Sequence, residues 1–82
     1  MEKTVTSKQY EALIGWLKEA RLSLGLSMRD LGNRLEVSHT YIYKIESLEY
    51  KLDVYQYAQY CEALELDPAW GMNYLIKKQT GL

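Results

Sequence analysis

The sequence predicts an all-α protein, a compact bundle of about five short helices. Apolar residues recur at three- and four-residue steps along the chain, which is the spacing of a helix face, and no segment alternates long enough to indicate a strand. Serine and aspartate residues stand at the start of these apolar-periodic segments, where they can cap helices. We expect one domain over residues 1–82, because a chain of this length supports a single small core.

The first helix is expected over about residues 7–24. Thr6 and Gln9 are placed to form a capping box at its start, and Gly25 can take the left-handed conformation that ends a helix. Its inward face is predicted from five apolar residues at helical spacing: Tyr10, Leu13, Ile14, Leu17 and Leu24.

Two short helices are expected next, capped by Ser27 and Ser38 and separated by the turn at residues 36–38. A turn this short forces the two helices to cross steeply. The angle between them should be filled by Leu31, Leu35, Val37, Ile42 and Ile45. The opposite side of the third helix must then face solvent, and it carries His39, Thr40, Tyr43, Lys44 and Ser47.

Asp53 is expected to cap the fourth helix, and Asp67 followed by Pro68 to open the fifth. Gly71 argues against a regular fifth helix, and Tyr55 is expected to be exposed. The inward residues of the fourth helix are predicted to be Val54, Tyr57, Ala58, Cys61 and Leu64. The last segment, residues 68–82, is more apolar than a solvent-facing terminus requires. We therefore expect it to form a dimer contact through Trp70, Met72 and Tyr74.

Composition argues against several classes of protein. The single cysteine, Cys61, gives no disulfide framework, and no apolar run is long enough for a membrane span or a secretory signal. We therefore expect a cytoplasmic protein with no membrane contact. The chain has one histidine and one cysteine on different predicted helices, no metal-ligand spacing and no glycine-rich phosphate loop. No enzymatic activity, metal or cofactor is expected.

The polar face of the third helix has the chemistry of a reader of the DNA major groove. Lys44 can donate to guanine O6 and N7, and Thr40 can hydrogen-bond a base or offer its methyl group to thymine. His39 can donate or accept near the helix start, and Tyr43 can reach a phosphate. Residues 27–47 are therefore interpreted as a helix-turn-helix that binds double-stranded DNA.

The segments LKEARLSLGLSMRDLGNRLEVSHTYIYKIES and KLDVYQYAQYCEALELDP resemble the phage-repressor and Cro type of helix-turn-helix regulator, the XRE family, from about Leu17 to Pro68. The resemblance implies a lambda-repressor-like bundle that binds DNA as a homodimer through its third helix. It implies base contacts by His39, Thr40 and Lys44, and a structural ion pair between Arg21 and Glu46. Phosphate contacts are expected from the helix starts, the third helix and the loop that follows it, by Ser27, Met28, Arg29, Ser38, Tyr43 and Lys51.

Four positions depart from the family pattern. Met28 stands where a glutamine is typical, so that only the helix N-terminus remains to bind phosphate there. Gly32 replaces an alanine, which we expect to cost little more than a methyl group. Glu36 and Leu48 replace glycines, and a left-handed backbone at either position would cost about 1 kcal/mol.

The charge balance leaves two functions open. Ten Lys and Arg face eleven Asp and Glu, for a net charge of −1, whereas domains that bind nucleic acid usually carry a basic surface. The leading interpretation is a sequence-specific transcription regulator, homodimeric on an inverted-repeat operator with half-sites about one helical turn apart. Phage regulators, restriction-modification controllers and DNA-binding antitoxins all fit it. The alternative is a protein-interaction module that keeps the fold and binds a protein partner, with weak or no DNA binding.

Overall fold

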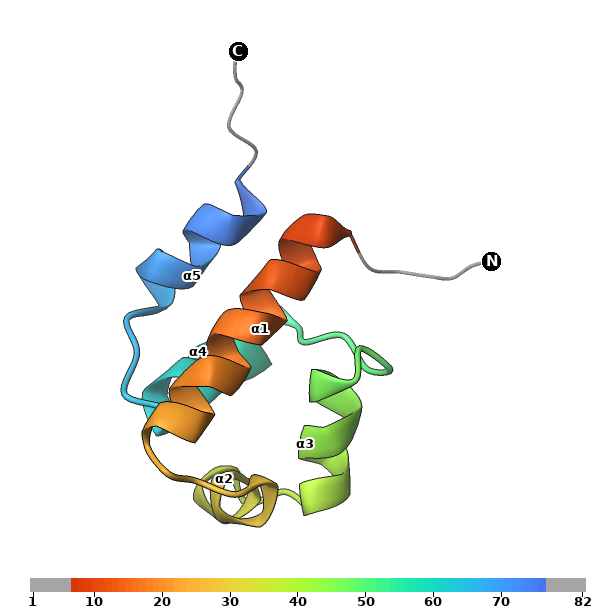
Figure 1. Ribbon diagram of the computed structural model, residues 1–82, viewed down its shortest axis with the longest axis vertical. Helices are drawn as coiled ribbons and strands as arrows, with labels where there is room; N and C mark the ends of the chain where they lie inside the picture. Colours follow the sequence, from red (N-terminus) through yellow and green to blue (C-terminus); the bar gives the residue numbers. More distant parts are fainter. Residues whose placement is uncertain (1–6, 77–82) are drawn as a thin grey trace.

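The computed structural model describes residues 7–76 and contains five α-helices and no strand in that range (Figure 1). The predicted all-α class and helix number are confirmed for this part of the chain. In order along the chain the helices are α1 (Lys8–Ser23), α2 (Met28–Leu35), α3 (His39–Glu46), α4 (Val54–Ala63) and α5 (Pro68–Leu75).

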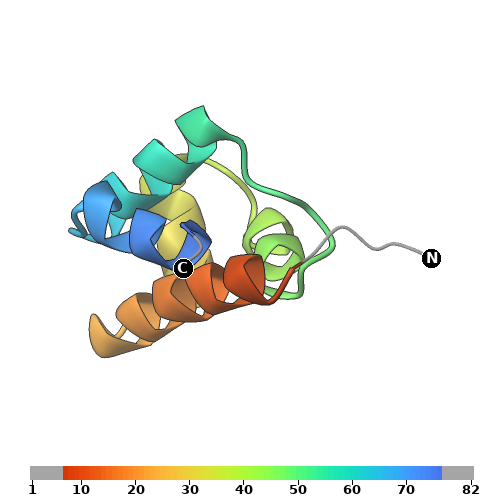
Figure 2. The same ribbon diagram turned by 90° about the horizontal axis from the view of Figure 1, so that it is seen from above.

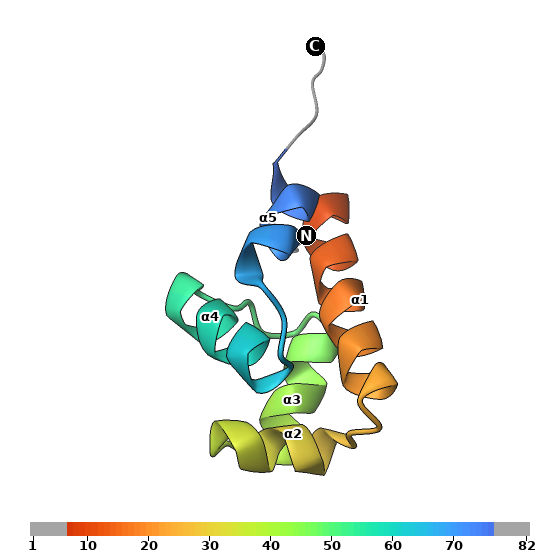
Figure 3. The ribbon, with the colours of Figure 1, turned by 90° about the vertical axis from the view of Figure 1, so that its left-hand side faces the viewer.

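α2 and α5 lie at opposite ends of the molecule. α1 runs between these ends, with α5 beside its first half and α2 beyond its last turn (Figures 1 and 3). Viewed from above, α1 and α4 lie on opposite sides of the bundle, and α3 lies away from α5 (Figure 2). None of the helices within residues 7–76 is long and apolar enough to cross a membrane.

One hydrophobic core joins the helices. It is formed by the buried side chains of Tyr10, Leu13, Ile14, Leu17, Leu31, Ile42, Ile45, Tyr57, Tyr60, Cys61 and Leu64. Cys61 is fully buried and has the character of a small hydrophobic residue. Burial of this apolar surface is the main favourable term that holds the short helices together.

Four residues that we expected to face the core are exposed instead. Leu24 and Val37 lie beyond the last turns of α1 and α2, where helical spacing no longer sets their direction. Val54 is 85% exposed, because it is the first residue of α4 and precedes the turn that packs. Ala58 is also exposed, one position past the buried Tyr57.

Side-chain caps begin the helices largely as predicted. Ser27 and Ser38 cap α2 and α3, and Asp53 and Asp67 cap α4 and α5. The start of α1 differs from the prediction, because Ser7 accepts a 3.1 Å hydrogen bond from the backbone N–H of Tyr10 and is the N-cap. Thr6 lies outside the described residues.

The first four helices end in the same backbone motif. In each, the C-cap residue or the residue directly after it is left-handed, and two backbone N–H groups reach back to carbonyls of the last turn, as in a Schellman motif. The left-handed residues are Gly25 (φ 72°), Glu36 (φ 60°), Leu48 (φ 70°) and Glu65 (φ 62°). Three of the four therefore carry a side chain where glycine is favoured.

Gly71 has a packing role that we did not predict. It is buried inside a regular α5, at the contact with α1 and α4. A Cβ at this position would lie 2.5 Å from Cζ3 of Trp16 and 2.9 Å from Cδ1 of Leu13, and it would overlap the hydroxyl of Tyr57. Because Gly71 has no side chain, α5 can approach the other two helices closely. Gly71 was expected to disturb the fifth helix, but it is the residue through which α5 packs.

Candidate nucleic-acid interface

The interface candidate is built on the steep crossing of α2 and α3, which the views of Figures 1 and 3 both show. Ile42 and Ile45 on α3 are 0% and 1% exposed, so this side of the helix is anchored in the core. The side chains of His39, Thr40 and Tyr43 on the opposite side are exposed. The predicted orientation of α3 is present, and it presents polar groups along about two helical turns.

Lys44 differs from the other residues predicted to read bases, because it is half-buried. Its Nζ lies 5.2 Å from the ring centroid of Tyr50 in the loop after α3. This distance is within the range of a cation–π interaction. Sequence reasoning missed Tyr50, since the contact depends on how the chain turns back after Leu48.

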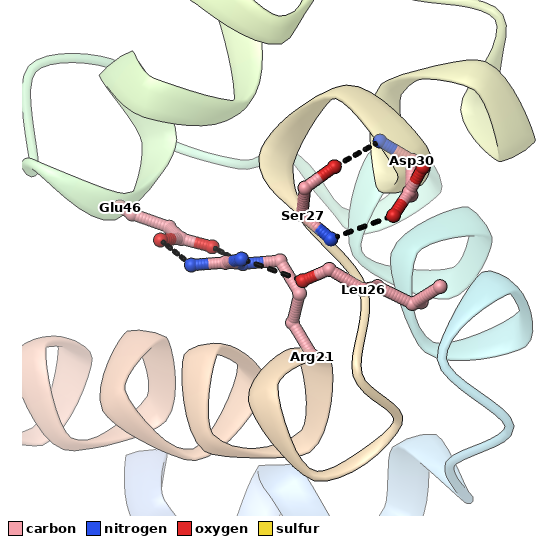
Figure 4. Close-up of polar contacts among 5 residues, drawn as sticks. All are labelled: Arg21, Leu26, Ser27, Asp30 and Glu46. Carbon is pink, nitrogen blue, oxygen red and sulfur yellow. Dashed lines mark hydrogen bonds and ion pairs between the residues drawn. The ribbon is translucent and has the colours of Figure 1, made fainter.

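The start of α2 offers fewer free groups to a phosphate than we expected. The backbone N–H of Ser27 donates to the carboxylate of Asp30, and the hydroxyl of Ser27 accepts from the backbone N–H of Asp30, both at 2.9 Å (Figure 4). The hydrogen bond that the Ser27 backbone N–H donates to the carboxylate is the main cause that lowers the pKa of Asp30, and the Ser27 side chain contributes less. Met28 is half-buried and packs against the core, whereas Arg29 is exposed.

Two further candidates for phosphate contact lie directly before α3 and in the loop that follows it. Ser38 is exposed, and its hydroxyl accepts a 3.2 Å hydrogen bond from the backbone N–H of Tyr41 as the N-cap. Lys51 is exposed in the loop before α4, with its Nζ 5.9 Å from the ring centroid of Tyr10. Arg29 and Lys51 are thus exposed, whereas Lys44, which lies between them along the chain, is half-buried and held over an aromatic ring.

Arg21 and Glu46 form the ion pair that the resemblance implied. Nε of Arg21 lies 2.7 Å from Oε2 of Glu46, and Nη2 lies 3.1 Å from Oε1, so the contact is bidentate (Figure 4). Nη1 of Arg21 also donates to the carbonyl of Leu26 at 2.8 Å. One buried guanidinium therefore joins the end of α1, the segment that leads into α2 and the last residue of α3.

The residues expected at a dimer contact lie far from this surface. Trp70, Met72 and Tyr74 on α5 are 67%, 42% and 39% exposed. Tyr74 also contacts Trp16 of α1, with ring centroids 5.9 Å apart. α5 lies toward the end of the molecule opposite α2, and neither view places it over α3 (Figures 1 and 3).

Arg34 is a second residue whose place the sequence did not indicate. Its Nη1 donates to the carbonyl of Ala63 at 2.8 Å and lies 3.7 Å from a carboxylate oxygen of Glu65. Arg34 thereby ties the end of α4 to α2, so it serves the fold rather than the exposed face of α3. Within residues 7–76, no group of three or more His, Cys, Asp or Glu side chains could hold a metal ion.

Comparison with known proteins places this geometry in a family. A family model described as "Helix-turn-helix" matches residues 17–71. An XRE-family like protein from Pseudomonas syringae pv. tomato str. DC3000 is 31% identical, with a TM-score of 0.77 over 83% of each chain. The clp gene regulator ClgR from C. glutamicum shares the fold at 24% identity, with a TM-score of 0.72 over 88% of this chain and 90% of that one.

No curated protein matches the chain. The family match covers most of the described residues and spans α2, α3 and α4 entirely. The chain therefore belongs to the XRE-type helix-turn-helix family of DNA-binding transcription regulators.

Proposed function

We propose that the protein regulates transcription as a sequence-specific homodimer that inserts α3 into the major groove of an inverted-repeat operator. The observation that carries this proposal is the two-sided character of α3. Ile42 and Ile45 are buried in the core while His39, Thr40 and Tyr43 are exposed on the opposite side. A helix fixed in this way can enter a groove without local unfolding.

The roles follow from the position of each side chain on α3. His39 and Thr40 begin the helix and are proposed to contact base edges, with Lys44 one turn further on. Tyr43 is exposed one turn after His39, where it is proposed to bind a phosphate together with Ser38.

Further phosphate contacts are proposed on both sides of α3. Arg29 is an exposed cation in the first turn of α2, and Lys51 is an exposed cation in the loop between α3 and α4. Met28 is proposed to contribute through its backbone N–H at the N-terminus of α2, where helix N–H groups favour an anion, because its side chain packs against the core. Ser27 is proposed to contribute as the cap residue beside it, although its own N–H and hydroxyl bond Asp30.

The proposed dimer contact is the apolar surface of α5, formed by Trp70, Met72 and Tyr74. These side chains expose large apolar groups that a second copy of the chain would cover. A two-fold axis through this surface would give a protein dimer whose operator has matching two-fold symmetry.

Selection of bound fragments from random double-stranded DNA tests the proposal directly. We expect an enriched inverted repeat with half-site centres about one helical turn apart. Lys44→Ala and Thr40→Ala should each weaken binding to that sequence by about 1–3 kcal/mol and relax the preference at one base pair. Lys18→Ala is the matched control, since Lys18 is exposed on α1.

The net charge of −1 supports a second candidate, a protein-interaction module with weak or no DNA binding. A groove binder loses affinity as salt rises, because cations that neutralise phosphates release counterions. If the selection enriches no sequence, and binding to mixed DNA does not respond to salt, DNA recognition by α3 is excluded and the interaction module is favoured.

A further inference from the structure

Lys44 is the base-reading candidate whose side chain the structure holds most firmly. We infer that Tyr50 is a positioning residue for DNA recognition, whose ring holds the Lys44 ammonium in place at the far end of the exposed face of α3. The contact is the 5.2 Å approach of the Lys44 Nζ to the Tyr50 ring centroid. This inference rests on the proposed function, in which Lys44 contacts a base.

The backbone after α3 brings Tyr50 back over Lys44. Leu48 is left-handed, with φ 70°, and reverses the chain direction. The carbonyl of Lys44 then accepts hydrogen bonds from the backbone N–H groups of Glu49 at 2.8 Å and Tyr50 at 3.1 Å. The residue that supplies the cation and the residue that supplies the ring are therefore tied together through the backbone.

A second ring supports Tyr50. The rings of Tyr41 and Tyr50 lie 5.9 Å apart between centroids, with a 53° angle between their planes. Tyr41 is half-buried on α3 and packs against the core. Contacts with Tyr41 and Lys44 restrict the Tyr50 ring, although 46% of this residue is exposed.

Restraint of Lys44 has a consequence for recognition. A free lysine side chain samples many rotamers, and contact with a base edge would remove that freedom. Half-burial and the aromatic face beneath the ammonium remove part of it before DNA arrives. The direction of the ammonium is then set by the protein, which favours one base position over its neighbours.

The test uses Tyr50→Phe, which keeps the ring, and Tyr50→Leu and Tyr50→Gln, which remove it. The Tyr50→Phe variant should bind the selected operator with the same affinity as the original protein. Each ringless variant should bind about two- to fivefold more weakly, which is the size of an exposed cation–π interaction. Tyr50→Leu and Tyr50→Gln should relax the preference at the same base pair as Lys44→Ala. When either is combined with Lys44→Ala, the affinity for the operator should fall no further than with Lys44→Ala alone.

A measurement without DNA checks the geometry itself. In nuclear magnetic resonance spectra of the free protein, the ε-methylene protons of Lys44 should be shifted upfield by the ring in the original protein and in Tyr50→Phe. The shift should disappear in the ringless variants. Tyr55→Leu is the matched control, because Tyr55 is 72% exposed on α4, and it should change neither the shift nor the affinity.

The outcomes separate this inference from the proposed function. If an operator is selected and the ringless variants bind it unchanged, or if their losses add to that of Lys44→Ala, Tyr50 does not position Lys44. An unshifted Lys44 resonance in the original protein also overturns the inference. If no operator is selected at all, the proposed function fails, and the inference fails with it.

Discussion

The guanidinium of Arg21 and the carboxylate of Glu46 form a bidentate ion pair that joins the end of α1 to the last residue of α3 (Figure 4). The two side chains are 7% and 5% exposed, so neither charge is well solvated. A third hydrogen bond from Arg21 to the carbonyl of Leu26 completes the arrangement. This pair sets the distance between the first helix and the helix that presents the polar face.

Removal of one partner should be costly, because it leaves a buried charge without compensation. We expect Glu46→Ala to lower the free energy of unfolding by about 3 kcal/mol, measured by urea denaturation at neutral pH. Glu65→Gln is the control, since the Arg34–Glu65 pair is solvent-exposed and should contribute less than about 1 kcal/mol. Equal effects of the two substitutions would show that the Arg21–Glu46 pair does not brace α3.

Acid should weaken the start of α2 through Asp30. Its pKa is lowered from the ordinary value of 3.8 by hydrogen bonds with Ser27, so the ionised form is favoured in the folded protein. The stabilisation is present above pH 4 and is lost as the pH falls through the lowered pKa. Asp30→Asn should therefore show less loss of stability than the original protein in denaturation curves taken across this range. If the free energy of unfolding falls equally in both proteins as the pH is lowered, Asp30 is excluded as a source of the acid sensitivity.

Left-handed residues with side chains give two sites where glycine should stabilise the protein. Glu36 and Glu65 have φ values of 60° and 62°, and both side chains are exposed. Because glycine adopts this conformation without steric cost, Glu36→Gly and Glu65→Gly should each raise the free energy of unfolding by about 1 kcal/mol. Thermal denaturation measures the gain, and Glu62→Gly inside α4 should instead be destabilising.

The helix ends show how far local sequence reasoning reached. Caps at Ser27, Ser38 and Asp53 were predictable, because a side-chain oxygen at a helix start acts on its own backbone neighbours. The left-handed residue at Glu65 gave no such signal, since glutamate is not typical of that conformation. At Leu48 the family resemblance did indicate a glycine position, and the backbone there is left-handed. The contact between Tyr50 and Lys44 was missed, because it depends on where the turn after Leu48 places the Tyr50 ring.

The exposed face of α3 was predictable because the periodicity of Ile42 and Ile45 fixes which side is buried. The room available to a side chain between two packed segments was not predictable from the sequence, and Gly32 is the clearest example. The family resemblance places an alanine at this position, and we expected the glycine there to cost little more than the lost methyl group. A Cβ on Gly32 would instead lie 2.7 Å from the carbonyl oxygen of Val37, because the chain folds back over α2 before α3 begins.

Gly32→Ala should therefore destabilise the protein by about 1–3 kcal/mol, as expected of an overpacked site. Gly15→Ala is a matched control with the opposite sign, because nothing lies within 4 Å of a Cβ there. That substitution should stabilise α1 by about 0.5–1 kcal/mol through the better helix propensity of alanine. Urea denaturation of the two variants measures both effects, and stabilisation by both would contradict the close approach of Val37 to α2.

Trp70 should decide whether α5 forms the dimer contact. It is 67% exposed, and a charged residue in its place would be buried without a partner in any dimer that covers α5. We expect Trp70→Glu to be monomeric in sedimentation experiments at concentrations where the original protein is dimeric.

The variant should still bind a single half-site and should lose its added affinity for the inverted repeat, since only the dimer engages both halves at once. Tyr55→Glu, an equally exposed aromatic position on α4, is the control and should remain dimeric. Dimers of unchanged stability in Trp70→Glu would place the contact elsewhere, and monomers of the original protein at every concentration would exclude the homodimer.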